Sequence, residues 1–377
     1  MRVQQSLWTD DRGWNGDWSE SADLLLAFGG SRTVTNKALW HSLSERAPSA
    51  IVLGCSTAGE IHGANVLDNS LSVMALSFKK TRLRAVQVNV EKPDHSFSAG
   101  NRLGTKLRAK NLRTIFLLSD GVAVNGSELV RGIRGAVDSN VAIAGGLAGD
   151  GPRFGTTYVG LNQVPLPGNV AAIGFYGTAL NVGHGSAGGW DEFGPEHTIT
   201  SSCGNVLLTL DGQPAWETYK KFLGTYIDEL PHSALLFPLR ICPPGRHDET
   251  LMRAVVGIDY LKKALILAGD IPRGYRAQLM RGHMGRLFEG AASAAQQANQ
   301  SCRGESAAIL VSCVGRKLVL GPRVAEEIAA VQNVLGDNTA IAGFYSYGGV
   351  APHEVTRETK LHNQTMTVTV LSERDAA

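Results

Sequence analysis

A glycine-marked segment that occurs three times restricts the folds open to this chain more than any other feature. Each copy, at residues 50–61, 141–150 and 339–350, is an apolar run that passes into glycines and small residues. The first and last copies align without a gap, and the middle copy has one residue fewer between its glycines. Such self-similarity indicates duplicated supersecondary units. For the middle copy, the general strand–turn–helix–strand order of α/β proteins is an alternative explanation.

The flanks of the three segments repeat as well. An apolar run precedes each copy, a helix-like stretch lies between the two runs, and alternating residues follow the first and last copies. Apolar spacings of three and four predict helices, and alternation predicts half-buried strands. We therefore predict an α/β fold of duplicated β-α-β-β units, with extended mixed sheets in one or two layers flanked by helices. The predicted helices span residues 36–46, 126–137 and 322–335, and a fainter fourth unit is expected at residues 233–270.

Composition limits the classes of function. Of 377 residues, 43% are hydrophobic and 19% charged, which allows two or three domains with apolar cores. The formal net charge is +2 and no basic run occurs, which argues against nucleic-acid binding. The apolar stretches are too short to cross a bilayer and the N-terminus has no apolar leader, so we expect a cytoplasmic protein without membrane insertion. Five widely spaced cysteines indicate neither a disulfide framework nor a zinc knuckle.

Several segments together resemble the signature of the FIST (F-box and intracellular signal transduction) family. The resemblance runs from about residue 20 to 372 and implies an N-terminal domain at 20–214 and a C-terminal domain at 215–372. One departure is the sequence Tyr347-Gly348-Gly349, where the family often has Tyr-Gly-Glu. This departure places a carboxylate role for the last repeat in question. The segments that carry the resemblance are residues 51–60, 144–150, 182–191, 204–215, 279–281, 343–348 and 361–366.

The resemblance implies a sensory ligand-binding protein in signal transduction rather than an enzyme. The chain is similar to stand-alone bacterial members that bind haem, sense nitric oxide and modulate a sensor histidine kinase. We therefore expect b-type haem as the cofactor, a gas at the iron as the input and a sensor histidine kinase as the partner. Other members have been proposed to bind small molecules such as amino acids, so a haem-free small-molecule sensor is the alternative. The sequence leaves homo-oligomerisation open.

A haem site needs an apolar slot, an axial ligand such as imidazole, and an acceptor that orients the ring. His184 is the first candidate for the metal ligand, because its flanking glycines let a planar group approach, and Trp190 can wall the slot. His362, at the start of a predicted strand, is the second candidate. The alternatives are a loop histidine bound to backbone for His184 and a turn-stabilising side chain for His362. No Cys-x-x-Cys-His occurs, which excludes covalently attached haem.

Further histidines and one cysteine are weaker candidates. His197 is expected to be solvated and His283 to lie on a helix face. Cys242, which precedes a proline, is a weak candidate for a thiolate ligand of haem. Four histidines beside turn residues are expected to be exposed: His62, His232, His247 and His353.

The glycine-marked loops offer a second kind of site. A strand end followed by small residues exposes backbone N–H groups and hydroxyls in a concavity, which can hold a carboxylate or an amide. Tight turns with satisfied hydroxyls are the alternative interpretation. The residues predicted to line this pocket are Cys55, Ser56, Thr57, Gly59, Glu60, Gly145, Gly146, Tyr345 and Tyr347.

An enzyme with a nucleophile is the third hypothesis. Cys55 or Ser56 can attack a substrate only if a histidine base lies nearby in space. No G-x-S-x-G elbow surrounds Ser56, and neither H-E-x-x-H nor a P-loop occurs. We therefore rank haem-based sensing of nitric oxide first, haem-free small-molecule sensing second and catalysis third.

Overall fold

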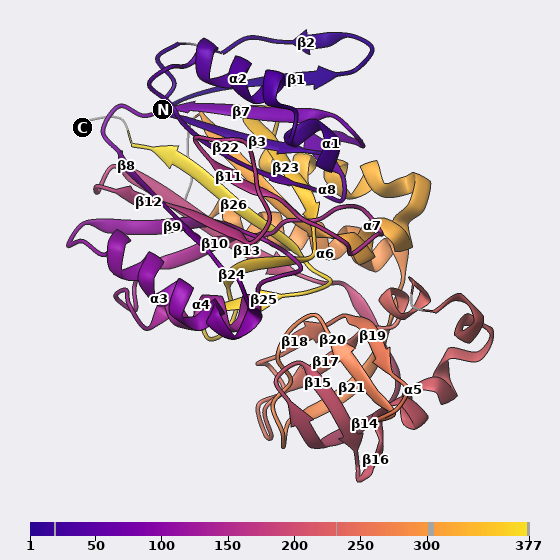
Figure 1. The fold of residues 1–377 in the computed structure, drawn as a ribbon. Coiled ribbons are helices and arrows are strands. Elements are labelled where there is room, and N and C mark those ends of the chain that lie inside the picture. The colour runs from indigo at the N-terminus through magenta and orange to yellow at the C-terminus, as the bar shows by residue number, and fades with distance from the viewer. Residues whose placement is uncertain (19, 231, 301–304, 375–377) are drawn as a thin grey trace.

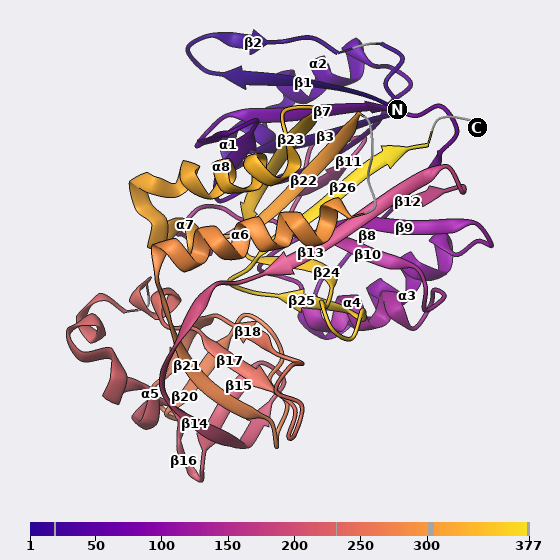
Figure 2. The same cartoon turned by 180° about the vertical axis from the view of Figure 1, so that it is seen from behind.

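The computed structural model describes residues 1–18, 20–230, 232–300 and 305–374. These residues form two parts, which Figures 1 and 2 show from opposite sides. The body, residues 1–187 and 284–374, holds three six-stranded sheets, and the barrel, residues 190–282, holds one eight-stranded sheet. The body sheets mix parallel and antiparallel pairs and carry helices on their outer faces. The predicted α/β class is confirmed.

Three repeats build the body. Each contains two neighbouring parallel strands joined through a helix, and a returning strand that pairs antiparallel with the first of them. The first strand of each repeat lies outside these three strands and pairs with the returning strand. Gly54, Gly145 and Gly343 occupy the same register on the second parallel strand. The middle copy is therefore a true repeat, as the glycine pattern indicated.

The first repeat starts its long helix at Asn36, whose side chain accepts hydrogen bonds from the backbone of Ala38 and Leu39. A short polar side chain at this position satisfies N–H groups that a helix start leaves free. The elements of this repeat are β1 (Arg2–Thr9), β2 (Gly13–Asn15), β3 (Leu24–Gly29), α1 (Ser31–Val34), α2 (Lys37–Arg46), β4 (Ile51–Ser56), β5 (Glu60–His62), β6 (Asn65–Leu67) and β7 (Leu71–Ser77).

The second repeat uses the same device, since Asn125 caps its second long helix by accepting from the Glu128 N–H at 3.1 Å. An additional helix precedes its first parallel strand and packs against that capped helix. The elements are β8 (Arg82–Asn89), η1 (Pro93–His95), α3 (Ser96–Leu107), β9 (Leu112–Ser119), α4 (Gly126–Arg134), β10 (Ala142–Leu147), β11 (Val159–Leu161) and β12 (Asn169–Tyr176).

The third repeat is interrupted after its outer strand by the barrel and resumes at α6. A helix directly follows its first parallel strand, and a second helix then leads into the next parallel strand. The elements are β13 (Leu180–Ala187), α6 (Met284–Asn299), β22 (Ser306–Cys313), α7 (Val314–Leu320), η4 (Gly321–Arg323), α8 (Val324–Leu335), β23 (Thr339–Ser346), β24 (Gly348–Pro352), β25 (Thr359–His362) and β26 (Met366–Glu373).

Each repeat lends a short segment to the sheet of another repeat. Strand β5 of the first repeat pairs with β23 of the third, β24 of the third pairs with β10 of the second, and β11 of the second pairs with β4 of the first. Just before each returning strand, Asn69, Gly168 and Gln364 share a left-handed φ of 61°, 72° and 58°. The exchange is cyclic, so the body has a pseudo-threefold arrangement and no repeat completes its own sheet.

The inner faces of the three sheets meet in one shared core. Phe28 of the first repeat stacks on Phe344 of the third with ring centroids 4.9 Å apart, and Phe116 of the second repeat lies in the same cluster. Outside the sheets, α3 packs beside α4 and α6 packs beside α8. Because this core is closed, space for a ligand is expected at strand ends or where the body meets the barrel.

The barrel is a separate antiparallel unit with its own apolar core. The two ends of its strand path, β18 and β19, are separated in the chain by Ala254 alone, so the sheet curls back toward itself. Its elements are β14 (Trp190–Cys203), β15 (Val206–Leu210), β16 (Gln213–Pro214), α5 (Ala215–Leu223), η2 (Gly224–Glu229), η3 (His232–Leu236), β17 (Leu239–Cys242), β18 (Leu251–Arg253), β19 (Val255–Asp259), β20 (Ala264–Leu267) and β21 (Arg276–Gly282).

The prediction of a fourth repeat at residues 233–270 is wrong. These residues form β17 to β20 of the barrel, where every strand pairing is antiparallel. A short apolar run followed by glycine looks the same in an antiparallel barrel and in a β-α-β unit, so the local pattern did not distinguish them.

Candidate functional site

The residues proposed as nucleophiles lie inside the fold. The Cys55 thiol belongs to the shared core of the three sheets, and burial raises its pKa well above the ordinary value. The Ser56 hydroxyl accepts a hydrogen bond from the Tyr158 N–H at 2.9 Å. A buried neutral thiol and an engaged, fully buried hydroxyl favour a packing role over a nucleophilic one.

The predicted pocket glycines are packed against neighbouring strands. A Cβ added to Gly145 would lie 1.9 Å from the Leu117 carbonyl oxygen, and one added to Gly146 would lie 2.6 Å from the Val311 side chain. Glycine is therefore needed here for close approach of backbones. Neither Gly145 nor Gly146 lines any of the five cavities described for residues 1–18, 20–230, 232–300 and 305–374.

Two predicted residues, Thr57 and Glu60, do line a cavity of about 490 Å³, which we call the Glu60 cavity. The Glu60 carboxylate accepts hydrogen bonds from the Thr57 hydroxyl and from the Ser70 N–H and hydroxyl, at 2.9 and 2.8 Å for Ser70. Burial raises the pKa of Glu60 to about 7 in spite of these bonds. Lys317 reaches over Gly59 and binds the Asp68 carboxylate at 2.5 Å, so these two charges of the cavity offset each other.

The two predicted tyrosines are fixed by buried carboxylates. The Tyr345 hydroxyl donates to Glu327 at 2.6 Å, and Glu327 in turn pairs with Arg316 at 2.6 Å. The Tyr347 hydroxyl donates to the Asp150 carboxylate, and its ring lines a more apolar cavity of about 360 Å³ between body and barrel. Tyr345 therefore holds the third repeat together, whereas Tyr347 faces space that a ligand can fill.

The predicted haem residue His184 lies within strand β13 rather than in a loop. Its Nδ1 lies 3.4 Å from the Thr369 hydroxyl, and its Nε2 is buried without a partner. Burial, helped by the nearby positive charge of Arg357, lowers the pKa of His184 to about 4. The imidazole is thus neutral, and its Nε2 is enclosed.

The other two predicted haem residues are also engaged. The His362 Nε2 lies 3.1 Å from the Ala351 carbonyl, and burial lowers the pKa of His362 to about 3. The Trp190 indole N–H donates to the Gln364 carbonyl at 2.7 Å. No histidine among the described residues lines the five cavities. As placed here, these residues offer haem no open slot.

The remaining histidines divide between surface and interior. His247 is exposed as expected, whereas the expectation for His353 is wrong, because its ring is buried and stacks on His362 with centroids 6.2 Å apart. His62 is half-buried, and the side chain of His232 lies outside the described residues. His283 is exposed at the N-cap of α6, one residue before the helix on which it was expected. His197 is half-buried against Asp211.

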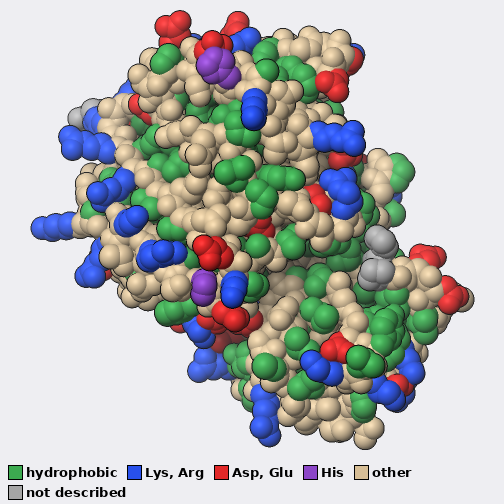
Figure 3. All heavy atoms as spheres, viewed as in Figure 1, with side chains coloured by type: hydrophobic (Ala, Val, Ile, Leu, Met, Phe, Trp, Pro, Cys, Tyr) green, Lys and Arg blue, Asp and Glu red, His purple; other side chains and the backbone are tan. Residues whose placement is uncertain are grey.

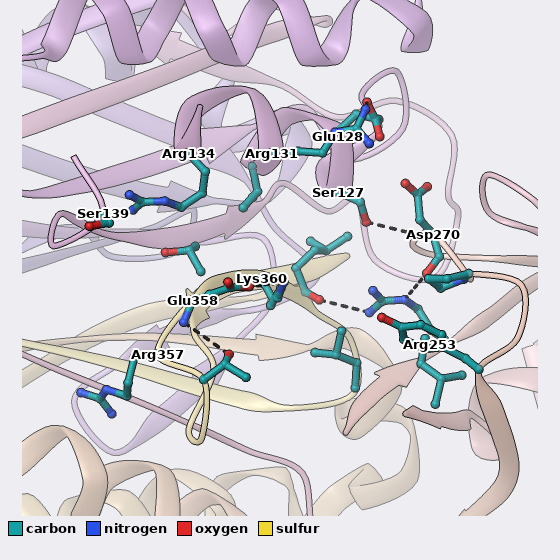
Figure 4. A pocket seen from close by; sticks show the side chains of 18 residues that line it. Ser127, Glu128, Arg131, Arg134, Ser139, Arg253, Asp270, Arg357, Glu358 and Lys360 are labelled. Atoms are coloured by element: carbon teal, nitrogen blue, oxygen red, sulfur yellow. Dashed lines mark hydrogen bonds and ion pairs between the residues drawn. The ribbon is translucent and has the colours of Figure 1, made fainter. Parts of the chain in front are cut away.

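A larger cavity of about 650 Å³, which we call the cleft, opens where the body meets the barrel. Figure 4 shows its walls: α4 of the second repeat, the segment around β25 of the third repeat, and the barrel. In the space-filling view, basic and acidic side chains gather along the edge of the body that faces the barrel (Figure 3). The charged residues of the cleft are Glu128, Arg131, Arg134, Arg253, Asp270, Arg357, Glu358 and Lys360.

Arg253 is the unusual group in the cleft, since it is a buried cation that forms no ion pair with any carboxylate of the described residues. It is 4% exposed, and its guanidinium donates to the backbone carbonyls of Asp270, Met252 and Leu361 at 2.9, 3.0 and 3.1 Å. Burial lowers the pKa of Arg253 to about 10, and the nearby Asp270 carboxylate opposes that shift. A buried guanidinium that lacks an ion pair among the described residues is poised to receive an anion.

The other charges of the cleft leave a positive excess. Five side chains are cationic and three are acidic. Lys360 pairs with Glu358 at 2.7 Å, and Arg131 pairs with Glu128 at 2.5 Å, whereas Arg134 donates to backbone carbonyls. Glu128 and Glu358 therefore each neutralise a neighbouring cation, and the cleft as a whole attracts negative charge.

Sequence reasoning missed the cleft. Its residues come from segments more than 200 positions apart and include no glycine-marked loop. The one available signal was an arginine in a strand-like run, Leu251-Met252-Arg253-Ala254-Val255, where an apolar residue is the norm.

The fold and the cleft define a class first: an α/β protein of three exchanged repeats with a charged cavity beneath an inserted barrel. Two family models together cover most of the chain. The FIST N domain matches residues 23–213, and the FIST C domain matches residues 215–352. The chain therefore belongs to the FIST family, whose domains are sensor domains of signal transduction.

Other comparisons add little. No curated protein matches this chain. The crystal structure of cyanuric acid hydrolase from A. caulinodans aligns over 100% of this chain and 99% of its own, with 9% identity and a TM-score of 0.35. Among the described residues, no helix combines the length and the apolar composition needed to cross a bilayer.

Proposed function

We propose that this protein is a sensor for a small anionic molecule, which binds in the cleft between body and barrel. The buried guanidinium of Arg253 carries this proposal, because it lines the cleft and forms no ion pair among the described residues, although the Asp270 carboxylate lies nearby. A carboxylate or phosphate can accept from the guanidinium edge that the backbone carbonyls leave free. A carboxylate on the ligand agrees with the amino-acid-like ligand expected for a haem-free sensor.

Binding in this position can be transmitted as a movement of the barrel. Direct polar contacts join the two walls of the cleft at a few points. The Asn125 amide donates to the Asp270 carboxylate at 3.1 Å, and the Asp270 N–H donates to Ser127 at 3.3 Å. The Arg253 guanidinium donates to the Leu361 carbonyl at 3.1 Å, and the His353 Nε2 lies 2.9 Å from the Thr250 carbonyl. A ligand that bridges the walls favours one orientation of the barrel over another. A protein partner can read that orientation from the surface.

The hinge for such a movement lies at Arg316. Two linkers join the barrel to the body. They lie side by side, because Trp190, just after the first linker, pairs with Gly282, just before the second. The Arg316 guanidinium donates to the carbonyl of Gly188, before the barrel, and to that of Leu287 at 2.7 Å, after it. One buried side chain thus joins the linker before the barrel to the first turn of α6, which follows the barrel, and this confines motion to the few residues beyond these contacts.

A ligand screen with variants tests the proposal. Thermal unfolding of the full chain is measured with L-amino acids, dicarboxylates and inorganic phosphate at constant ionic strength. We expect one anion class to raise the melting temperature, and Arg253→Gln to weaken its binding by roughly 10-fold to 100-fold. Arg357→Gln and Lys360→Gln, at the cleft rim, should weaken it less. Glu60→Gln, in the other cavity, is the matched control and should bind normally.

Two outcomes would overturn the anion proposal. One is the absence of stabilisation by every member of the panel at millimolar concentration. The other is binding that survives unchanged in both Arg253→Gln and Arg357→Gln. The rim variant matters, because the Arg357 side chain is exposed and its loss should not disturb folding.

Haem, nitric oxide and a sensor histidine kinase stay predictions of the family resemblance. A hemin titration followed by absorption separates them from the anion proposal. Because the His184 Nε2 is enclosed, we expect the spectrum to remain that of free hemin. A Soret band that responds to nitric oxide and is lost in His184→Ala, but not in His362→Ala, would favour the haem sensor instead.

A further inference from the structure

Three different ligand-type side chains converge on one edge of the barrel. None of the three lines the cleft, although Ile241, the neighbour of Cys242, does. Atoms of Glu196, Cys242 and His247 that can bind a metal all lie within 4.8 Å of one another. Glu196 belongs to β14, Cys242 ends β17, and His247 stands in the loop that follows. Cys242 is buried, and none of the three side chains takes part in the proposed cleft function.

The local sequence explains how His247 returns to Cys242. Two prolines and Gly245 follow the cysteine, and Gly245 adopts a φ of 73°, which suits glycine. The Arg246 N–H then donates to the Pro243 carbonyl at 3.2 Å, closing a tight turn. The turn places the imidazole on the same side as the thiol.

Two cations flank the three groups, and each is paired with a carboxylate. Arg276 donates to one oxygen of Glu196 at 2.7 Å, which orients the carboxylate and leaves its second oxygen free. Arg240, the other cation that acts on Cys242, is paired with Glu192 at 2.7 Å. A thiolate and a carboxylate supply two negative charges to the metal, although Arg276 already offsets part of the Glu196 charge, and an imidazole completes the set.

We propose that Glu196, Cys242 and His247 form a zinc site with one position left for water. Sulfur and nitrogen ligands favour Zn²⁺ over Mg²⁺ or Ca²⁺, and three protein ligands with an open fourth position are typical of zinc sites that bind an exchangeable group. Tetrahedral bonds of about 2.0–2.3 Å require the ligand atoms to close to roughly 3.5 Å. The exposed loop of His247 can supply that movement. On binding, the Cys242 thiol releases its proton to solvent.

Cobalt provides the direct test. The full chain, freed of metal with a chelator, is titrated with Co²⁺ and then with Zn²⁺. We expect one equivalent of Co²⁺ to give a thiolate-to-cobalt charge-transfer band and d–d bands of tetrahedral strength, both displaced by Zn²⁺. Cys242→Ser should abolish the charge-transfer band, and His247→Ala should weaken Zn²⁺ binding roughly 100-fold.

The controls keep the proposal falsifiable. Cys203→Ser removes an exposed thiol at the end of β14 and should leave the spectra unchanged. His247 is exposed, so His247→Ala should fold even if Cys242→Ser does not, and circular dichroism without metal checks both. The proposal fails if the band persists in Cys242→Ser, disappears in Cys203→Ser, or if the unaltered chain binds no Co²⁺ at micromolar concentration.

Discussion

Two buried arginines, Arg316 in the body and Arg253 at the cleft, differ in whether a carboxylate pairs with them. Arg316 has no exposed surface and pairs at 2.6 Å with Glu327, which also receives the hydroxyls of Ser312 and Tyr345. Arg253 is nearly as buried but donates to backbone carbonyls without an ion pair among the described residues. In the body a carboxylate neutralises the buried Arg316, whereas at the cleft the buried Arg253 has no ion pair among the described residues.

This difference teaches which buried charge to interpret as structural and which as functional. Desolvating a cation is costly, and an internal carboxylate offsets that cost at all times. A cation that lacks such a partner is offset fully only when something else supplies the negative charge. The comparison therefore assigns folding to Arg316 and ligand binding to Arg253, and the following changes test that assignment.

The largest effect is expected for Arg316→Leu. The substitution leaves the Glu327 carboxylate buried without its partner, so we expect the free energy of unfolding to fall by about 3 to 5 kcal/mol. Urea unfolding measures the change. Adding Glu327→Leu should restore part of the loss, because the unpaired charge is removed with it. A loss below about 1 kcal/mol for the single variant would break the comparison, since buried-pair disruption is expected to exceed that.

A smaller effect is expected for Glu60→Gln, and it depends on pH. Because the pKa of Glu60 is raised to about 7, the native state holds a proton that the unfolded chain releases above about pH 4.5. Stability from this group is therefore greatest at low pH and is lost as pH rises from about 4.5 to 7. The variant should lack this component and gain roughly 1 to 2 kcal/mol relative to the parent at pH 8.

The control for Glu60 is the difference between parent and variant across the whole pH range. The depressed pKa values of His184 and His362 give stability that is lost as pH falls, so the parent curve alone mixes opposite trends. Subtraction cancels the histidines. A difference that stays flat between pH 4 and 8 would show that the Glu60 carboxyl titrates normally.

The smallest effect on stability is expected for Arg253→Gln. The substitution removes hydrogen bonds to three carbonyls but also removes a buried cation, and these contributions oppose each other. We expect a net change within about 1 kcal/mol in urea unfolding without ligand. Destabilisation as large as that of Arg316→Leu would mean that Arg253 is a folding residue, and the division between body and cleft would fail.

The local pattern predicted much of the body. Helices were expected at 36–46 and 126–137, and α2 and α4 start at the caps that Asn36 and Asn125 provide. The strands around Gly54, Gly145 and Gly343 were expected as well. These features depend on neighbouring residues, so a short window contains their cause. The role of the glycines was different from the one proposed, because what approaches them is the adjacent strand rather than a ligand.

The sequence by itself determined that the chain folds from repeated strand–helix–strand units, because each unit depends on contacts within about 40 residues. Only the tertiary structure decided how the repeats exchange strands and where charge is left open. Arg253 meets Leu361 across 108 positions, and Asn125 meets Asp270 across 145. Whether a buried charge finds a partner depends on chain segments that local pattern does not connect, so the cleft becomes visible only once the whole chain has folded.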